Sequence, residues 1–219
     1  KLFYDGIKNQ IDSKFISRKI YNIAKKINSK KFSKIVFSKV HKKFGGHLDV
    51  MVSGGAKLDS EIATFFNTLG FTVCEGYGLT ETSPVIAVNS IKYNKVGTVG
   101  KALYNTELRI VDEELWARGP QIMKGYYNHP EKTAEVLTED KWFKTGDLAV
   151  IDEEGYLTIL GRKNSMIVLS NGKNIDPETV ENKILGMSGT LIKEIAVLNH
   201  NDKLAAIIVP DLLELESKG

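Results

Sequence analysis

The chain has 219 residues, of which 42% are hydrophobic and 26% are charged, and its net charge is +3. These values are ordinary for a soluble globular protein, and apolar runs as short as PVIAV exclude a bilayer-spanning segment. The single cysteine, Cys74, excludes an internal disulfide and favours a reducing compartment, with the cytoplasm as the default.

The charges are unevenly distributed along the chain. Residues 1–47 carry 13 Lys and Arg against 2 Asp and Glu, whereas the other 172 residues carry 17 basic and 25 acidic side chains. In the same segment, apolar residues at helical spacing predict one helix from Asp5 to about Asn28 and a second from Phe32 to Phe44. The second helix is expected to stop at the pair Gly45-Gly46. The front of the chain is therefore predicted to be a basic helical segment.

Residues 48–84 have the order strand, helix, strand. The stretch LDVMVSGGA predicts a buried strand and a turn, Asp59 or Ser60 can cap a helix that ends at Gly70, and FTVCEGYG predicts a second strand. This order is typical of a parallel βαβ unit, which places the glycine-rich tips at the carboxyl ends of two neighbouring strands. Open α/β sheets bind ligands at that edge.

The rest of the chain changes character twice. Short β-rich stretches that alternate with turns predict a mostly antiparallel β subdomain over residues 85–160, with one helix at TAEVL. The polar run GRKNS follows at Gly161. Beyond it, MIVLS predicts a strand, PETVENKIL a helix with Pro177 in its first turn, and EIAVLNH and KLAAIIVP two further strands. Residues 162–219 are therefore expected to begin a separate α+β module.

The run VCEGYGLTETSP gathers residues that suit a nucleotide. Gly76 and Gly78 allow the backbone to approach a ligand closely, and exposed amides there can bind phosphate oxygens. The ring of Tyr77 can stack on a planar base, Thr80 offers a hydroxyl, and Glu81 offers a carboxylate suited to Mg²⁺ held between protein and phosphates. The alternative is a tight turn with a half-buried tyrosine. The run is not the dinucleotide fingerprint, because Glu81 replaces its third glycine.

Six motifs occur in one order along the chain: SGGA, GYGLTE, RGPQIMKGYY, WFKTGD, GYLTILGR and SNGKNIDPETVE. In order and approximate spacing they resemble the adenylate-forming superfamily, and within it the bacterial long-chain fatty acid–CoA ligases (acyl-CoA synthetases). The resemblance covers essentially the whole chain. It implies an α/β fold in which residues 1–161 form the C-terminal portion of the large AMP-binding domain, a βαβ layer (1–84) plus a distorted β-barrel subdomain (85–161). Residues 162–219 would begin the small mobile C-terminal domain.

The resemblance also implies an activity. A medium- or long-chain fatty acid would be activated by ATP to acyl-AMP and transferred to the thiol of coenzyme A, with Mg²⁺ as the metal. Adenylation helps because a carboxylate is a poor acyl donor, whose leaving group would be oxide. Two other functions remain open: adenylation of another carboxylate, such as an amino or aryl acid, for a carrier-protein thiol, and a non-catalytic AMP-binding module. Nucleic-acid binding is not expected, because no recognition motif accompanies the basic residues.

Residue by residue, the resemblance assigns roles near the base and the phosphates of the nucleotide. Thr80 resembles the α-phosphate contact and Glu81 the Mg²⁺ ligand, and both are candidate catalytic residues. The residues that resemble the loop lining the adenine and the acyl carboxylate, or the cradle of the adenine itself, are Gly54, Gly55, Ala56, Glu75, Gly76, Tyr77 and Gly78.

A second group of residues resembles the ribose contacts and the moving parts. Asp147 matches the aspartate that holds both ribose hydroxyls, a task for two acceptor oxygens, and Arg162 matches an arginine that also reaches the ribose. Ile159 sits where a nonpolar residue flanks the nucleotide. Asn164 falls on the hinge between domains, and Gly172 resembles the glycine that serves the thioester step, a candidate catalytic position. Simpler alternatives are a turn cap for Asp147, a surface ion pair for Arg162 and an ordinary turn glycine at Gly172.

The chain also departs from the family pattern. The phosphate loop rich in Ser, Thr and Gly is expected to precede this stretch, and the catalytic lysine near the C-terminus is expected to follow it. The chain contains neither and opens without an initiator methionine. We therefore expect it to be part of a longer enzyme, inactive in adenylation by itself. The segment Ile110–Pro120 is also shorter than the glycine-bearing hairpin usual in relatives.

The basic segment 1–47 has two interpretations. The simpler is a pair of helices with a solvated lysine face. The functional alternative is a docking surface for an anionic membrane or for the phosphates of coenzyme A. Either would suit a cytoplasmic enzyme that is peripheral to the inner face of the membrane and uses substrates that partition into bilayers.

Overall fold

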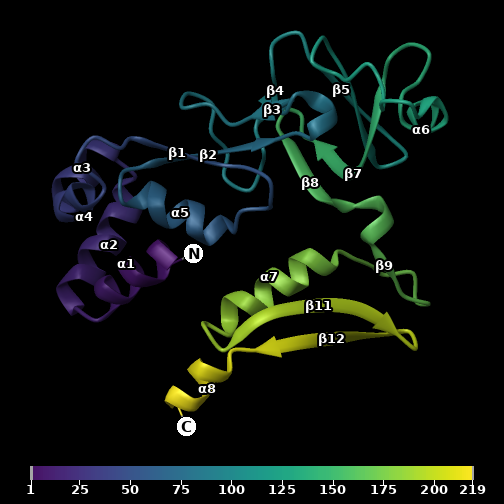
Figure 1. Ribbon diagram of the computed structural model, residues 1–219. Coiled ribbons are helices and arrows are strands. Elements are labelled where there is room, and N and C mark those ends of the chain that lie inside the picture. Colours follow the sequence, from purple (N-terminus) through teal and green to yellow (C-terminus); the bar gives the residue numbers. More distant parts are fainter. Residues whose placement is uncertain (1, 219) are drawn as a thin grey trace. The chain divides into compact units, whose positions relative to one another are not determined.

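The computed structural model (Figure 1) describes residues 2–218. The chain divides into two compact units. The first unit comprises Lys1–Leu108, Ala117–Phe143 and Ile151–Thr158, and the second comprises Arg109–Trp116, Lys144–Val150 and Ile159–Gly219. The chain contains both helices and strands, so the expected α/β class is confirmed. The predicted domain boundary at residue 161 stays a prediction.

The basic segment forms four helices rather than the two predicted. They are α1 (Leu2–Asp12), α2 (Phe15–Ile27), α3 (Lys30–Val36) and α4 (Ser38–Lys43). Lys14, extended at φ −119° and ψ 119°, separates α1 from α2, and Phe37, at φ −104° and ψ 25°, separates α3 from α4. The prediction of two single helices is wrong, because the apolar spacing continues across residues whose backbone leaves the helix. Gly45 and Gly46, both with positive φ, follow the last helix as expected.

The core beneath these helices is aromatic. Phe65 of α5 (Ser60–Thr68) meets Tyr4 edge-on with ring centroids 4.9 Å apart, and His41 stacks on Phe71 at 4.2 Å. Nε2 of His41 also bonds to the carbonyl oxygen of Leu69 at 2.9 Å. Burial of a large apolar side chain contributes roughly 1.5–3 kcal/mol to folding. This core fixes α5 and the strand that follows it, and so positions the glycine-rich tips.

The predicted βαβ unit is confirmed, but its first strand is not buried as expected, because Val52 is 76% exposed. Strand β1 (Val50–Ser53) pairs in parallel with β2 (Thr72–Tyr77), and α5 packs against β2 (Figure 1). Asp59 caps α5, because its carboxylate accepts a hydrogen bond from the N–H of Glu61 at 2.7 Å. Gly70 follows the helix with φ +99°, a conformation that favours glycine.

Two short strands extend this sheet. β3 (Ala87–Val88) pairs antiparallel with β2, and β4 (Lys101–Ala102) pairs antiparallel with β3, so the strand order is β1-β2-β3-β4. A single 3₁₀ turn, η1 (Thr80–Thr82), connects β2 to β3. The quoted glycine-rich run therefore forms the end of β2 and a tight turn.

The β-rich part contains a second four-stranded sheet. Its strands are β5 (Glu107–Val111), β6 (Glu114–Arg118), β7 (Phe143–Ile151) and β8 (Leu157–Arg162), in that order, and α6 (Pro130–Val136) lies between β6 and β7 in the sequence. Within residues 2–218 this sheet is open, so the expected barrel is not closed. Asp112 and Glu113 join β5 to β6 with φ 49° and 65°, as in a type I′ turn. The short segment thus forms a hairpin with a two-residue turn.

The last part of the chain has the expected α+β order. It contains η2 (Lys163–Ser165), β9 (Ile167–Val168), β10 (Asn174–Ile175), α7 (Pro177–Met187), β11 (Ile192–His200), β12 (Lys203–Pro210) and α8 (Leu212–Lys218). Pro177 lies in the first turn of α7, as predicted, and Asp176 caps the helix. The neighbouring residues Ile207 and Ile208 of β12 are both exposed although their side chains point to opposite faces. No helix within residues 2–218 is both long and apolar enough to span a bilayer.

Candidate nucleotide-binding site

The two glycine-rich tips meet at one edge of the first sheet, as the βαβ prediction requires. Ser53 is the register partner of Glu75 at the carboxyl ends of the parallel strands. A Cβ added to Gly54 would lie 3.5 Å from the carbonyl oxygen of Gly76, so the backbones of the two tips are in contact distance. Gly55 has φ +87°, and the exposed Ala56 then leads toward α5.

Glu75 lies buried near the end of β2. Its side chain is buried, and burial raises the pKa of the carboxyl, while the N–H groups of Gly97 and Leu58 partly oppose that shift. Its carbonyl oxygen accepts from the N–H of Asn89 at 2.8 Å. Glu75 therefore ties two loops to the end of β2. Its assigned contact with the adenine stays a prediction.

This burial makes the stability of the protein depend on pH. A raised pKa means that the folded state holds the Glu75 proton more tightly than the unfolded state, whose carboxyl has the ordinary value of 4.5. The free energy of unfolding is therefore expected to fall as pH rises from 4.5 through the folded-state pKa. Glu75→Gln should flatten this fall, as measured by thermal denaturation at a series of pH values. The exposed Glu153→Gln is the control, and an equally steep fall in Glu75→Gln would contradict the assignment.

The turn after Tyr77 is closed by its own hydrogen bonds. The fully buried hydroxyl of Thr82 accepts from the N–H of Leu79 at 2.8 Å and lies 3.0 Å from the carbonyl oxygen of Pro84. A Cβ on Gly78 would lie 1.8 Å from that same carbonyl oxygen. Packing within the chain therefore requires the second glycine, and Tyr77 is half-buried, as in the simpler alternative. Their contacts with a nucleotide stay predictions.

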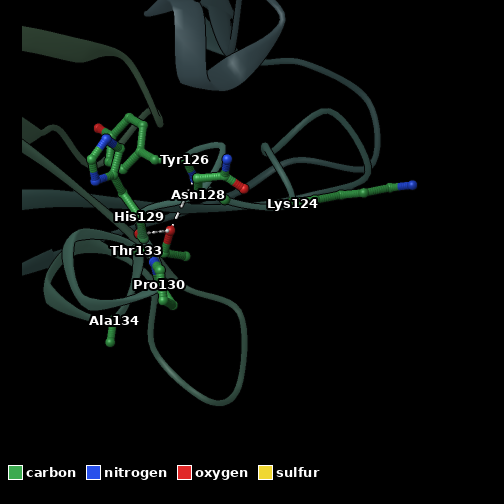
Figure 2. Close-up of a pocket in the computed structure, with 8 residues that line it drawn as sticks. Lys124, Tyr126, Asn128, His129, Pro130, Thr133 and Ala134 are labelled. Carbon is green, nitrogen blue, oxygen red and sulfur yellow. Dashed lines mark hydrogen bonds between the residues drawn. The ribbon is translucent and has the colours of Figure 1, made fainter.

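Glu81 is held by a loop that the sequence reasoning gave no residue-level role. Thr80 is exposed at the start of η1, and Glu81 follows it, half-buried. The hydroxyl of Tyr126 donates to Oε1 of Glu81 at 2.9 Å, and the N–H of Met123 donates to its carbonyl oxygen at 2.8 Å. Both partners belong to the motif RGPQIMKGYY. The place of this motif in the ordered series was the only feature of the sequence that indicated a role for the loop. Tyr126 and His129 also line a shallow cavity of about 470 Å³, shown in Figure 2.

At this position the Glu81 carboxylate is the one acidic side chain proposed as a ligand for a magnesium ion. Within residues 2–218 no group of three His, Cys, Asp or Glu side chains is arranged to hold a metal. Mg²⁺ usually binds through one or two carboxylates together with waters and substrate phosphates, so a single glutamate fits that mode of binding. The donor set at Glu81 is therefore compatible with a nucleotide-bound Mg²⁺.

The candidate ribose residues form a pair within the second unit. Asp147 lies within β7, not in a turn, and its side chain is only 5% exposed. Nε of Arg162, at the end of β8, lies 3.4 Å from Oδ1 of Asp147, and the arginine side chain is 65% exposed. The ion pair predicted as an alternative for Arg162 is thus present, but with a buried carboxylate as its partner. A buried aspartate beside an accessible arginine can accept hydrogen bonds from a pair of hydroxyls.

A residue missed by the sequence reasoning, Glu114, holds the backbone next to Asp147. Oε1 of the buried Glu114 accepts from the N–H of Gly146 at 3.0 Å, and its Oε2 lies 3.0 Å from Nζ of Lys163. Gly146 itself has φ +74°. The only signal in the sequence was the position of Glu114 in the stretch ELWARGP. Glu114 therefore links the strand that carries Asp147 to the residue after Arg162.

The remaining candidates lie on the same unit. Ile159 is half-buried in β8, and Asn164 is exposed in η2. Gly172 occupies the turn between β9 and β10 with φ +77°, and its N–H donates to the carbonyl oxygen of Leu169 at 2.8 Å. This geometry is that of a turn glycine, and its role in a thioester step stays a prediction. The adenine-side candidates belong to the first unit and the ribose-side and hinge candidates to the second.

Comparison with known proteins relates the chain to AMP-binding enzymes. The family model described as AMP-binding enzyme matches residues 18–127. The chain is 43% identical over 154 residues to the long-chain-fatty-acid–CoA ligase FadD15 of Mycobacterium bovis, covering 70% of this chain and 26% of that protein. It is 34% identical over 206 residues to the chloroplastic long-chain-fatty-acid–acyl-carrier-protein ligase AEE15 of Arabidopsis thaliana, covering 84% and 28%. The chain thus spans about a quarter of the length of these curated relatives.

A solved structure has the same fold. The o-succinylbenzoate coenzyme A synthetase (MenE) of Bacillus subtilis, determined in complex with ATP and magnesium ion, aligns with a TM-score of 0.65 and 29% sequence identity. The alignment covers 77% of this chain and 38% of that one. It confirms the expected part of an adenylate-forming fold.

Proposed function

Because the chain belongs to the AMP-binding enzyme family, we propose that the intact protein activates a medium- or long-chain fatty acid with ATP and transfers the acyl group to coenzyme A. The observation that carries the proposal is the pair formed by buried Asp147 and accessible Arg162, 3.4 Å apart, in motifs that resemble those of this family. Two carboxylate oxygens suit the two hydroxyls of a ribose, a donor pattern that AMP presents. Similarity to FadD15, whose name states a fatty-acid–CoA ligase, supports the choice of substrates.

In this proposal the residues act by binding and orienting the nucleotide. Asp147 accepts from the ribose hydroxyls, Arg162 reaches the same sugar, and Thr80 donates to the α-phosphate. Glu81 would hold Mg²⁺, which neutralises phosphate charge when bound. The backbone and side chains proposed to enclose the adenine and the acyl carboxylate are those of Gly54, Gly55, Ala56, Glu75, Gly76, Tyr77, Gly78 and Ile159. Asn164 is the proposed hinge, and Gly172 is proposed to approach for the thioester step.

The proposal is tested by ATP–pyrophosphate exchange with the intact protein that contains this chain. Exchange that depends on a fatty acid, followed by acyl-CoA formation, is the expected result. If exchange depends only on an amino or aryl acid, that acid is the substrate and the fatty acid is not. Transfer to acyl carrier protein in place of coenzyme A would instead match AEE15, the other named relative. If the protein binds nucleotide but catalyses no pyrophosphate exchange with any carboxylate tested, the result supports a non-catalytic AMP-binding module.

We further propose that α2 docks the protein on an anionic membrane on the cytoplasmic side. Residues 13–48 contain eleven Lys and Arg and no Asp or Glu. On α2, the apolar residues Ile16, Ile23 and Ile27 remain exposed, and their spacing places them on one side of the helix. Lys19 and Lys26, both exposed, lie beside this stripe on the helix surface. Basic residues beside an exposed apolar stripe are typical of helices that lie in the membrane interface.

Vesicle flotation of the intact protein tests this docking. Binding is expected on vesicles that contain anionic phospholipid and not on neutral vesicles, and it should weaken as salt increases. A lysine near an anionic surface is worth about 1 kcal/mol, so Lys19→Glu with Lys26→Glu should reduce binding roughly tenfold or more. The matched charge change at exposed Lys132 and Lys193 is the control. Equal binding by both double variants would reject α2 as the docking surface.

A further inference from the structure

Glu81 is fixed at two points by one loop of the first unit. The hydroxyl of Tyr126 donates to Oε1 of its carboxylate at 2.9 Å, and the N–H of Met123 donates to its carbonyl oxygen at 2.8 Å. The first bond orients the side chain and the second holds the backbone. An ionised carboxylate has about four acceptor positions, so one hydrogen bond leaves capacity for a cation.

Tyr126 is itself held by its own loop. Its N–H donates to Oγ1 of Thr133 at 2.9 Å, and the Thr133 hydroxyl donates to the carbonyl oxygen of His129 at 2.9 Å, as the dashed lines in Figure 2 show. Gly125, at φ +145°, precedes it, and a Cβ there would lie 2.8 Å from Cγ2 of Thr133. The tyrosine backbone therefore cannot shift without disturbing the start of α6. Because its backbone is fixed, the Tyr126 hydroxyl can hold the Glu81 carboxylate in one position.

The direction of this hydrogen bond follows from the chemistry of the two groups. A phenol carries a hydrogen that it can donate, whereas a carboxylate oxygen accepts. The bond of 2.9 Å therefore runs from the Tyr126 hydroxyl to the Glu81 carboxylate.

We propose that Tyr126 is a positioning residue that holds the Glu81 carboxylate in the orientation in which it receives the magnesium ion of a bound nucleotide. The inference rests on the proposed function, because it takes a magnesium–nucleotide complex as the ligand. Without the hydroxyl, Glu81 would keep its charge but sample several side-chain rotamers. Affinity for the cation would then fall more than the rate reached when the cation saturates the site.

The test compares Tyr126→Phe with Tyr127→Phe in the intact protein. Both changes remove one phenolic hydroxyl, but Tyr127 is 89% exposed and serves as the matched control. In Tyr126→Phe, the free Mg²⁺ concentration for half-maximal ATP–pyrophosphate exchange should rise roughly tenfold, while the rate at saturating Mg²⁺ falls less than threefold. Tyr127→Phe should match the wild type in both quantities. An unchanged Mg²⁺ requirement in Tyr126→Phe would overturn the proposal.

A binding measurement separates this inference from the proposed function. Calorimetry of ATP binding at a series of Mg²⁺ concentrations needs no turnover, and Tyr126→Phe should shift the Mg²⁺ dependence of binding in the same direction. Thr133→Val, which removes the hydroxyl that anchors Tyr126, should produce a smaller shift with the same sign. If the wild type binds ATP with Mg²⁺ but exchanges no pyrophosphate, the ligase function fails and the positioning role is still measured. If ATP binding in the wild type does not depend on Mg²⁺, the positioning role is rejected.

Discussion

Asp147→Ala is expected to lower fatty-acid-dependent ATP–pyrophosphate exchange by the intact protein on the order of a hundredfold or more. The carboxylate is almost fully buried, and Arg162 is its neighbour at 3.4 Å. Each hydrogen bond to a charged group is worth about 1.5–3 kcal/mol, so loss of two ribose contacts should remove roughly 3 kcal/mol or more of binding. Calorimetric titration with AMP should show the same loss. The rate and the affinity are both measured because they report on the same contact.

Two further variants show whether the loss comes from the ribose contact. Asp147→Asn keeps the shape and one acceptor oxygen, so its exchange rate should fall between those of the wild type and Asp147→Ala. Glu153→Ala, at an exposed position in the turn before β8, should leave exchange unchanged. AMP affinity in Asp147→Ala equal to that of the wild type would remove Asp147 from the site. Thermal denaturation of each variant shows that it is folded.

Gly78→Ala is expected to destabilise the fold by about 3 kcal/mol or more, at the upper end of overpacking effects. The added Cβ would lie 1.8 Å from the carbonyl oxygen of Pro84 and 2.7 Å from Cα of Val85. Because both neighbours are backbone atoms, a side-chain rotation cannot relieve the clash. The turn that carries Glu81 would have to open. Urea denaturation followed by circular dichroism measures the change.

Gly76→Ala is the matched control for this loss of stability. Its Cβ would lie 3.5 Å from the carbonyl oxygen of Ala87, an ordinary contact, and the position has no positive φ. The free energy of unfolding should therefore change by less than about 1 kcal/mol. If nucleotide approaches this backbone as proposed, the same variant should still bind AMP more weakly. Equal stability of Gly78→Ala and the wild type would contradict the packing explanation.

The sequence was a good guide where local chemistry determines local structure. The cap of α5 by Asp59 or Ser60, the stop at Gly70 and the start of α7 at Pro177 were each predicted from a residue type with a known backbone preference. Of the two cap candidates, the structure uses Asp59. The two breaks that the prediction missed in the basic segment have a non-local origin. Lys14 and Phe37 interrupt the helices of the basic segment, although neither residue type forbids a helix. The packing of the helices on one core determines where they break. The spacing of apolar residues alone carries no information about that packing.

The candidate site was less accessible to sequence reasoning, because its supporting contacts are long-range. Tyr126 and Glu81 are 45 positions apart in the sequence, and Gly146 and Glu114 are 32 apart. No local pattern encodes such pairs. The sequence also suggested a ligand as the reason for Gly78, whereas the position of Pro84 is sufficient. Motif order selected the candidate segments, and the structure shows which distant residues hold Glu81 and Gly146.

The exposed strand β12 has a consequence for handling the polypeptide. Isoleucines on its two faces remain in water, and in the part of the chain that the structure describes the strand has one hydrogen-bonding neighbour, β11. An exposed apolar strand edge of this kind can form hydrogen bonds with strands of other molecules. Concentrated samples of the isolated 219-residue polypeptide should therefore precipitate as intermolecular β-sheet, and Ile207→Lys should improve solubility.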